Sequence, residues 1–142
     1  METTLTIIKP DAVAAGNAGN ILAHLEREGF EILAVRKMSL TESQAKAFYE
    51  VHKERPFYGS LVEFMTSGPV VPVALERNNA VKYLREVMGA TNPEEAAAGT
   101  VRSLYATSIE KNAIHGSDSA ENAAIELNFF FSRAELIAAG SR

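Results

Sequence analysis

Hydrophobic residues recur along this chain with two different periods, and their alternation predicts strands separated by helices. Apolar and β-branched runs predict strands at residues 4–9, 30–38, 69–76 and 113–115. Apolar positions three and four residues apart predict helices across residues 21–25, 45–52, 61–65, 80–88, 101–109 and 120–131. This order favours an α/β fold, although it fits both a parallel sheet and an antiparallel sheet covered by helices.

Polar and irregular stretches add detail to this pattern. Thr41 and Gln44 have the spacing of a capping box, which starts the helix that follows. Tyr49 and His52 lie four and seven positions after Ala45, so we expect them to share the apolar face of that helix. Residues 89–100 contain Thr, Asn, Pro and Gly without helical periodicity, and we expect a long surface loop there.

The last predicted helix has two apolar faces. Asp118 and Glu121 are spaced to cap its start. One apolar stripe consists of Ala120, Ala123, Ala124, Leu127 and Phe131. At 100° per residue, Glu126 lies at the border of that stripe, where a carboxylate can be partly buried and still reach a neighbour. Ile125 and Phe129 lie on the opposite side and predict a subunit contact.

Composition narrows the class of protein. The length of 142 residues suits one domain with its own hydrophobic core, and we expect a single domain over residues 1–142. Apolar runs stay far below the roughly 18 residues of a membrane span, and the first residues lack signal-peptide character, so we expect a cytoplasmic protein without membrane contact. The absence of cysteine excludes disulfides and thiolate chemistry. The net charge of −4 argues against a surface dedicated to nucleic acid.

His115 is the most prominent candidate for chemistry, because it lies among small polar residues in the string NAIHGSDS at residues 112–119. Gly116 permits a sharp turn that would fold His115 back against Glu126, and Ser117 adds a hydroxyl without bulk. A neutral imidazole keeps one free lone pair, which can act as a base, a nucleophile or a metal ligand. From these residues alone, a histidine that only hydrogen-bonds a turn is an equal alternative.

Cationic and polar side chains gather where predicted strands end or loops begin. They are Lys9, Arg85, Thr91, Arg102 and Asn112. Lys and Arg donors are what phosphoryl transfer requires, because in that reaction the protein mainly positions groups and neutralises charge. Neither GxxxxGKS/T nor GxGxxG occurs, so side chains would have to hold the phosphates. Taken singly, each of these residues could also be an ordinary surface or turn residue.

Seven short motifs resemble the nucleoside diphosphate kinase family over essentially the whole chain. In chain order they are residues 9–13 (KPDAV), 48–52 (FYEVH), 55–57 (RPF), 64–69 (FMTSGP), 89–93 (GATNP), 99–102 (GTVR) and 112–119 (NAIHGSDS). The last is the most specific, and the others keep the family's order and spacing. The resemblance implies a ferredoxin-like βαββαβ fold, with a four-stranded antiparallel sheet covered by helices, added helices and a long loop.

The resemblance also implies an activity and its participants. Members of this family move the γ-phosphoryl group of a nucleoside triphosphate to a nucleoside diphosphate by a ping-pong route, through a phosphohistidine that would be His115 here. Such an enzyme maintains nucleotide pools. Mg²⁺ would be bound to the nucleotide phosphates, with no direct protein ligand assigned. Asp118 is the candidate for a contact through water. Because family members are commonly tetramers or hexamers, we expect a homo-oligomer.

The resemblance assigns three kinds of role to individual residues. The residues themselves indicate the role of Glu126: if one lone pair of a neutral His115 faces the phosphate, Glu126 would take the other ring N–H and orient the ring. The other residues at the catalytic centre would be Lys9, Tyr49 and Ser117. The phosphates and ribose would meet Lys9, Tyr49, Arg85, Thr91, Arg102 and Asn112, with His52 near the phosphates. Phe57 would stack on the base, backed by Leu61 and Ile109, and this predicts broad nucleotide tolerance because every base has a π-face.

The chain departs from the usual family pattern just after Arg102. Ser103-Leu104 stands where many members have a small residue followed by Asp, which puts the packing or subunit contacts of that loop in doubt more than the chemistry. A binding or regulatory protein on the same fold is the competing hypothesis, and it ranks lower because every proposed catalytic position is filled. Three widely spaced histidines offer no recognisable metal-ligand spacing.

Overall fold

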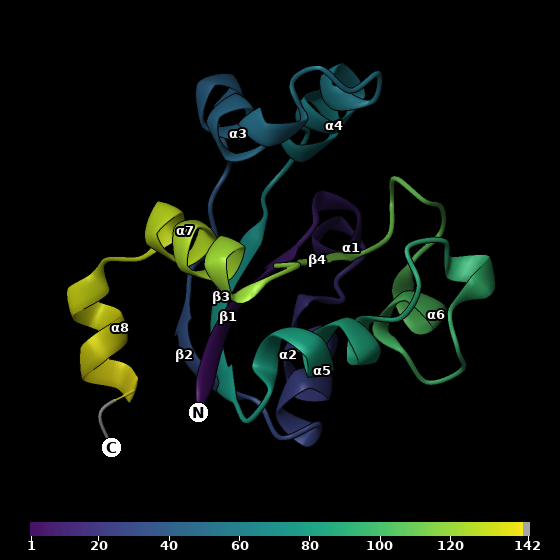
Figure 1. Cartoon of the computed structure of the whole chain (residues 1–142). Coiled ribbons are helices and arrows are strands. Elements are labelled where there is room, and N and C mark those ends of the chain that lie inside the picture. Colours follow the sequence, from purple (N-terminus) through teal and green to yellow (C-terminus); the bar gives the residue numbers. More distant parts are fainter. Residues whose placement is uncertain (141–142) are drawn as a thin grey trace.

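The computed structural model describes residues 1–140, and these residues form a four-stranded antiparallel sheet (Figure 1). Its strands are β1 (Glu2–Ile8), β2 (Glu31–Val35), β3 (Val71–Arg77) and β4 (Ile114–Gly116). The order across the sheet is β2-β3-β1-β4, and each neighbouring pair is antiparallel. This is the ferredoxin-like arrangement that the motifs imply, and the parallel alternative is excluded.

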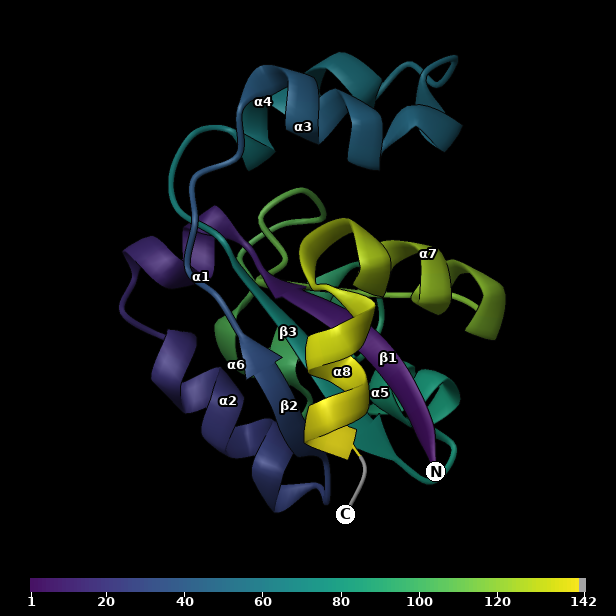
Figure 2. The ribbon, with the colours of Figure 1, turned by 90° about the vertical axis from the view of Figure 1, so that its left-hand side faces the viewer.

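Helices cover both faces of this sheet. The α-helices are α1 (Pro10–Ala14), α2 (Ala18–Arg27), α3 (Glu42–Phe48), α4 (Tyr58–Met65), α5 (Ala80–Met88), α6 (Val101–Tyr105), α7 (Ala120–Phe130) and α8 (Arg133–Gly140). Two 3₁₀ turns are η1 (Glu50–His52) and η2 (Pro93–Glu95). Figures 1 and 2 show α2 and α5 on one face, α7 and α8 on the other, and α3 with α4 as a pair beyond one end of the sheet. Across residues 1–140, no helix combines the length and apolar character needed to cross a membrane.

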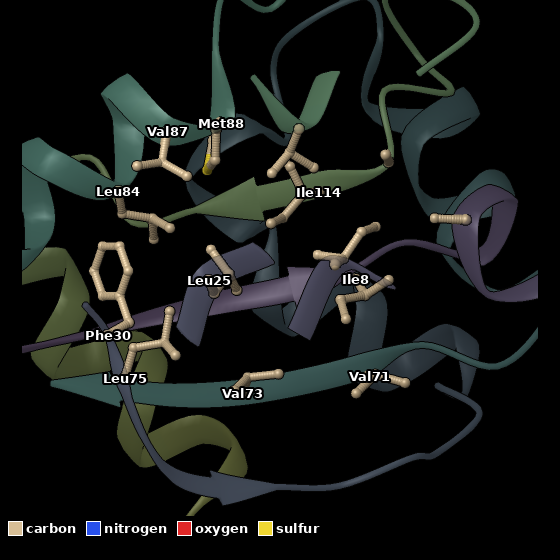
Figure 3. Packing of buried hydrophobic residues seen from close by; sticks show 14 of the residues in the cluster. Ile8, Leu25, Phe30, Val71, Val73, Leu75, Leu84, Val87, Met88 and Ile114 are labelled. Carbon is tan, nitrogen blue, oxygen red and sulfur yellow. The ribbon is translucent and has the colours of Figure 1, made fainter. Parts of the chain in front are cut away.

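The first core layer lies between the sheet and helices α2 and α5 (Figure 3). Its fully buried side chains include Ile8, Leu25, Val73, Leu84 and Ile114. Gly116 belongs to this layer, because a Cβ at that position would lie only 2.5 Å from Sδ of Met88 on α5. The predicted sharp turn at Gly116 is therefore wrong: Gly116 ends β4 without a positive φ, and it is a glycine where α5 approaches the strand closely.

The second core layer joins the opposite face of the sheet to α7 and the α3–α4 pair. Leu5 and Ile7 of β1 cluster with Leu127 and Phe130 of α7, because alternate residues of a strand face opposite sides. Of the expected stripe, Ala123, Leu127 and Phe131 are buried, whereas Ala120 and Ala124 are exposed and Phe130 is buried in addition. Packing of α7 across β1 carries Glu126 to the side of β4.

Two predicted helices end earlier than their apolar periodicity suggests. Thr41 and Gln44 do form the capping box of α3, but the helix ends at Phe48 and Tyr49 is its C-cap. His52 lies in the 3₁₀ turn η1, so the expectation that Tyr49 and His52 share one α-helical face is wrong. Helix α6 ends at Tyr105 because the next residue is extended, which leaves residues 106–113 as a loop.

The cap of α7 and the presence of two further helices also differ from the sequence-based expectation. Ser119 caps α7 by accepting the N–H of Asn122 at 3.1 Å, whereas Asp118 accepts the Asn122 side-chain amide at 2.6 Å. Helix α1 has only five residues and leaves little periodicity to detect. Helix α8 had a detectable signal, since Ser132 and Glu135 form a reciprocal capping box at 2.7 and 3.1 Å.

Candidate active site

A cleft of about 420 Å³ lies where β4, the η1–α4 segment and the loop at residues 106–113 meet. Most of the predicted site residues line it: Lys9, Tyr49, His52, Phe57, Leu61, Thr91, Arg102, Ile109, Asn112, His115 and Glu126. Phe48 and Val51 complete the lining. A larger hollow of about 840 Å³ between α1 and α4 contains none of these residues. The fold therefore gathers the predicted set, which is scattered from position 9 to position 126, into one place.

His115 is fixed in this cleft by strand pairing and by a carboxylate. It pairs with Ile7 across β1 and β4, and its carbonyl accepts the hydroxyl of Thr6 at 2.6 Å. Nε2 of His115 lies 2.8 Å from Oε1 of Glu126, which also accepts the Ser117 hydroxyl at 2.6 Å. A carboxylate can only accept, so Nε2 carries the ring hydrogen and the free lone pair is on Nδ1. Within residues 1–140, the structure gives Nδ1 no hydrogen-bond partner.

Aromatic side chains wall the ring of His115. Phe48 meets it edge-on at 5.6 Å between ring centroids, and Tyr49 does so at 6.4 Å. Burial, with a smaller contribution from the charge of Glu126, raises the pKa of Tyr49, so its hydroxyl stays protonated near neutral pH. That hydroxyl is buried and has no hydrogen-bond partner among the described residues. A buried polar group left unpaired is costly, so Tyr49 has hydrogen-bonding capacity that a ligand could use.

Lys9 is a buried cation held at the end of β1. Only 8 % of the residue is exposed, and its Nζ donates to Oδ1 of Asn112 at 2.8 Å. Asn112 in turn donates from Nδ2 to the carbonyl of Thr91 at 3.2 Å. Burial lowers the pKa of Lys9 to about 8; the nearby Arg102 acts in the same direction and Asp11 opposes it. Lys9 is thus charged at neutral pH and carries hydrogens that Asn112 does not use.

Arg102 is a second buried cation in the cleft. Its Nη1 and Nη2 donate to the carbonyls of Gly89 at 3.1 Å and Ile114 at 2.8 Å. Burial, followed by the charge of Arg85, lowers the pKa of Arg102 to about 10, which leaves it charged at neutral pH. Its Nε is buried and finds no acceptor within residues 1–140. Within residues 1–140, neither Lys9 nor Arg102 forms an ion pair, and two such buried cations at one cleft are a strong binding determinant for an anion.

Arg85 and Asp118 lie beside the cleft and not in it. Both line an adjacent hollow of about 560 Å³ at the start of α5. Arg85 donates from Nη1 to the carbonyl of Gly116 at 3.2 Å, so it braces the strand that carries His115. Ser117 is fully buried and acts on the site through Glu126. In this structure Arg85 affects the cleft by its charge, which helps to lower the pKa of Arg102. Asp118 accepts a hydrogen bond from the side chain of Asn122.

Apolar side chains form the outer rim of the cleft. Phe57 is 47 % exposed and Ile109 is 59 % exposed, whereas Leu61 is partly buried between them and the core. The rings of His52 and Phe57 lie 5.6 Å apart at the centroids. An exposed aromatic face beside a cationic floor fits a ligand with a flat ring at one end and negative charge at the other.

Asp11 is a functional candidate that the sequence reasoning missed. It lies in the first turn of α1, and its Oδ2 accepts the N–H of Ala113 at 3.1 Å. Burial raises the pKa of Asp11, while the Ala113 amide and the charge of Lys9 oppose that shift. A signal was present in the sequence, because Asp11 lies two residues after Lys9 within the first motif. Its partner more than a hundred residues away could not be read from that motif.

No group of three or more His, Asp or Glu side chains within residues 1–140 is arranged to hold a metal ion. Glu126, the carboxylate in the cleft, is already engaged by His115 and Ser117. A metal at this cleft would therefore have to find most of its ligands on a bound molecule or in water. Phosphate oxygens are suitable ligands for Mg²⁺, which usually keeps several waters and few protein ligands.

Comparison with known protein families gives a match over nearly the whole chain. The family model described as nucleoside diphosphate kinase matches residues 2–136. The nucleoside diphosphate kinase of Campylobacter fetus subsp. fetus is 60 % identical over 136 residues, which are 96 % of this chain and 99 % of that protein. The nucleoside diphosphate kinase of Persephonella marina is 53 % identical over 137 residues, with coverage of 96 % and 98 %.

Solved structures give the same result for the fold. The nucleoside diphosphate kinase of Aquifex aeolicus superposes with a TM-score of 0.92 at 48 % identity, covering 94 % of this chain and 97 % of that one. The enzyme from Encephalitozoon cuniculi superposes with a TM-score of 0.88 at 34 % identity, covering 92 % and 89 %. The similarity therefore extends from the sequence motifs to the complete arrangement of the sheet and helices.

Proposed function

The chain belongs to the nucleoside diphosphate kinase family, and within this phosphotransferase activity we propose that His115 carries the phosphoryl group from one nucleotide to the next. The observation that carries the proposal is the pairing of His115 with Glu126 at 2.8 Å, in a cleft that also contains Lys9 and Arg102. A histidine that merely satisfied a turn would not need a partly buried carboxylate on one nitrogen and two buried cations in the same cleft.

The first half of the reaction forms a bond between Nδ1 of His115 and the γ-phosphorus of the donor. The Nδ1 lone pair attacks, the bond from the γ-phosphorus to the β–γ bridging oxygen breaks, and the nucleoside diphosphate leaves with that electron pair. The Nε2 hydrogen remains on the ring, where Glu126 stabilises the positive charge that the ring gains. No proton has to leave the histidine, so Glu126 orients the ring and need not act as a base.

The second half returns the group to a different nucleotide. A terminal oxygen of a nucleoside diphosphate attacks the phosphorus, the bond to Nδ1 breaks, and the lone pair returns to the ring. The reaction is then symmetric about His115, which is what a ping-pong route requires. Lys9 and Arg102 neutralise charge on the moving group in both directions, supported by the unused Nε of Arg102 and the unpaired hydroxyl of Tyr49.

The two ends of the substrate are treated differently in this proposal. Thr91 and Asn112 would contact ribose or phosphate next to Lys9, while the base would stack on Phe57 against Ile109. Stacking discriminates weakly between bases. Broad use of purine and pyrimidine nucleotides follows, and a preference of many orders of magnitude for one base in steady-state assays would contradict it.

Kinases of this family use a divalent metal, and we propose that here it is Mg²⁺ bound to the nucleotide phosphates. The described carboxylates fit this arrangement, because none is clustered for direct metal binding and Glu126 is engaged by His115. When bound, Mg²⁺ would neutralise phosphate charge and orient the chain of phosphates. Asp118 could contribute only through water from the neighbouring hollow.

We also propose that residues 1–142 form one domain that assembles as a homo-oligomer, tetramer or hexamer, in the cytoplasm. Exposure of Ile125 at 67 % and Phe129 at 40 % on the outer side of α7 supports self-association. The cytoplasmic location follows from the substrates, since nucleotide pools are maintained there. Light scattering of the purified protein tests the assembly, and a monomer at micromolar concentration would contradict it.

A two-step labelling experiment tests the proposed route. The protein is incubated with ATP labelled in the γ-phosphoryl group and with Mg²⁺, freed of nucleotide, and then mixed with GDP. We expect an acid-labile, base-stable label on the protein that maps to His115 and passes to GTP in the second step. Transfer between nucleotides without any labelled protein would refute the phosphohistidine route while leaving the family activity intact.

A further inference from the structure

We infer that Asp11 is a positioning residue for phosphoryl transfer, because its carboxylate holds the unusual backbone at Ala113 that places Asn112 on one side and His115 on the other. The inference rests on the proposed role of His115 and deepens it. Asp11 lines the hollow between α1 and α4 and not the cleft, so it would act through the backbone and not by touching the nucleotide.

The backbone at Ala113 adopts a conformation that residues with a Cβ avoid. Its φ is +72°, and Asn79 is the only other residue besides glycines in the described chain with a positive φ. The N–H of Ile114 donates to the carbonyl of Asn112 at 2.8 Å, which closes a three-residue turn around Ala113. Such turns persist where the surrounding structure holds them. Ala113 is fully buried, so water cannot replace a missing partner.

The junction between β1 and α1 supplies the groups that hold this turn. Asp11 Oδ2 accepts the N–H of Ala113 at 3.1 Å, and the N–H of Lys9 donates to the carbonyl of Ala113 at 2.9 Å. The N–H and the carbonyl of Ala113 are thus both hydrogen-bonded, by Asp11 and Lys9, which lie two positions apart. Removal of the Asp11 carboxylate would leave a buried amide without its acceptor, which favours rotation of the backbone into a different conformation.

The neighbours of Ala113 are the residues that would meet the phosphate. Asn112 accepts from Lys9 Nζ at 2.8 Å, and Ile114 accepts from Arg102 Nη2 at 2.8 Å. His115 follows directly. A change at Ala113 would therefore displace both buried cations relative to Nδ1 of His115, and misplacement by about 1 Å can cost on the order of 10²-fold in rate. Asp11 is placed to prevent that displacement.

Four variants, assayed at pH 6.5 where Lys9 stays charged, test this role. Asp11→Ala should lower kcat/KM about 30-fold, through a lower kcat and a higher KM, because both the nucleophile and the cations move. Asp11→Asn keeps an oxygen that can accept the amide hydrogen and should lose about threefold. Ala113→Gly should stay within about twofold of wild type, because glycine adopts φ +72° without strain. The double variant D11A/A113G should recover to within about fivefold of wild type.

The alternative is that Asp11 only stabilises the first turn of α1, and the variants separate the two roles. A structural role would lower the melting temperature without a change in KM for the folded enzyme, and Ala113→Gly would not restore it. The inference is overturned if Asp11→Ala stays within twofold of wild type. It is equally overturned if the double variant is no more active than Asp11→Ala, or if Asp11→Asn is as impaired as Asp11→Ala.

Hydrogen exchange of the Ala113 amide measures the hydrogen bond from Ala113 to Asp11 independently of catalysis. Wild type should protect this amide, and Asp11→Ala should raise its exchange rate at least tenfold relative to the amides of β4. Unchanged exchange would refute the inference even if activity fell. A wild-type protein that never becomes labelled on His115 would refute the proposed function, and the exchange measurement would still decide whether Asp11 holds Ala113.

Discussion

The floor and the rim of the cleft are built in opposite ways. On the floor, Lys9, Arg102 and Asn112 are each less than 10 % exposed, and each is tied to at least one other group by a hydrogen bond. On the rim, Phe57 and Ile109 are about half exposed, and neither side chain can form a hydrogen bond. The fold therefore fixes the end that would meet phosphate and leaves the end that would meet the base open.

This difference corresponds to what a phosphoryl carrier must do. Charge builds up at the phosphate in every turnover, so donors that are already oriented avoid a cost of reorganisation during the reaction. The base changes from one turnover to the next, so a flat apolar contact serves better than directional hydrogen bonds, which would reject every base but one. Variants on the floor should consequently have much larger effects than variants on the rim.

Replacement of His115 by alanine should have the largest effect of all. Loss of the nucleophile should lower kcat/KM for nucleotide transfer by more than about 10⁴-fold and remove the acid-labile phosphoprotein. Circular dichroism and thermal unfolding should show a folded protein. Although only 21 % of the His115 side chain is exposed, it belongs to neither of the two core layers. Residual transfer near the wild-type rate would place the nucleophile at another residue and break the distinction between floor and rim.

Glu126→Gln tests whether the carboxylate next to His115 acts by orienting the ring. A glutamine can still contact Nε2, but it no longer offers a charge to the ring, and a hydrogen bond to a charged group contributes about 1.5–3 kcal/mol. We expect kcat to fall about 10- to 100-fold with a much smaller change in KM, measured by single-turnover labelling of His115. Glu121→Gln on the exposed side of the same helix is the matched control and should stay at the wild-type rate. Equal losses in both variants would point to a general effect on α7.

The framework of the fold could be predicted where local periodicity and packing agree. Strands at residues 4–9 and 69–76 and the helix at residues 80–88 were placed within two residues of their observed bounds, because buried strands and amphipathic helices have clear patterns. The helix from Thr41 was predicted too long, because Tyr49 is buried in either conformation and periodicity cannot distinguish a 3₁₀ turn from an α-turn. The antiparallel sheet came from the family motifs and not from the order of elements.

The site could be predicted as a set of residues and not as a set of contacts. Side chains tied to motifs, such as Lys9 and His115, lie together in the cleft as expected. Arg85 was expected at the phosphates, yet it braces Gly116 from the next hollow, because only the tertiary packing of α5 decides which way it extends. The hydrogen bond between Asp11 and Ala113 depends on a positive φ at Ala113, and no sequence pattern predicts that conformation in a residue other than glycine.

The pH dependence of activity tests the floor through the charge of Lys9. Burial lowers the pKa of Lys9 to about 8, so the ammonium that would bind phosphate is lost as the pH rises through that value. We expect kcat/KM, which reports the free enzyme, to fall about tenfold per pH unit above pH 8. The fall in kcat should begin at higher pH, since bound phosphate favours the charged form. In Lys9→Arg the remaining activity should show no such fall between pH 8 and 10, because arginine keeps its charge.

Stability should change with pH in the opposite direction to activity. The folded-state pKa of Lys9, about 8, lies below the unfolded value of 10.5, so the unfolded chain binds more protons between these two pH values. This group therefore adds to the free energy of unfolding as the pH rises from 8 to 10.5, by up to about 3 kcal/mol. Urea unfolding of wild type and Lys9→Met across this range measures the difference. A wild-type stability that falls relative to Lys9→Met would contradict the buried, charged Lys9.

Phe57→Ala should have the smallest effect, and its pattern across nucleotides is more informative than its size. Loss of one stacking face removes about 1–3 kcal/mol of binding, and the exposure of Phe57 places the expected change at the lower end, about a tenfold rise in KM with kcat unchanged. The rise should be similar for ADP, GDP, CDP and UDP, and Phe57→Leu should recover only part of it, because leucine keeps apolar area without a π-face. A tenfold loss for one base and none for the others would show that the rim reads the base. It would then share the directional character of the floor, and the tolerance proposed for this enzyme would need another origin.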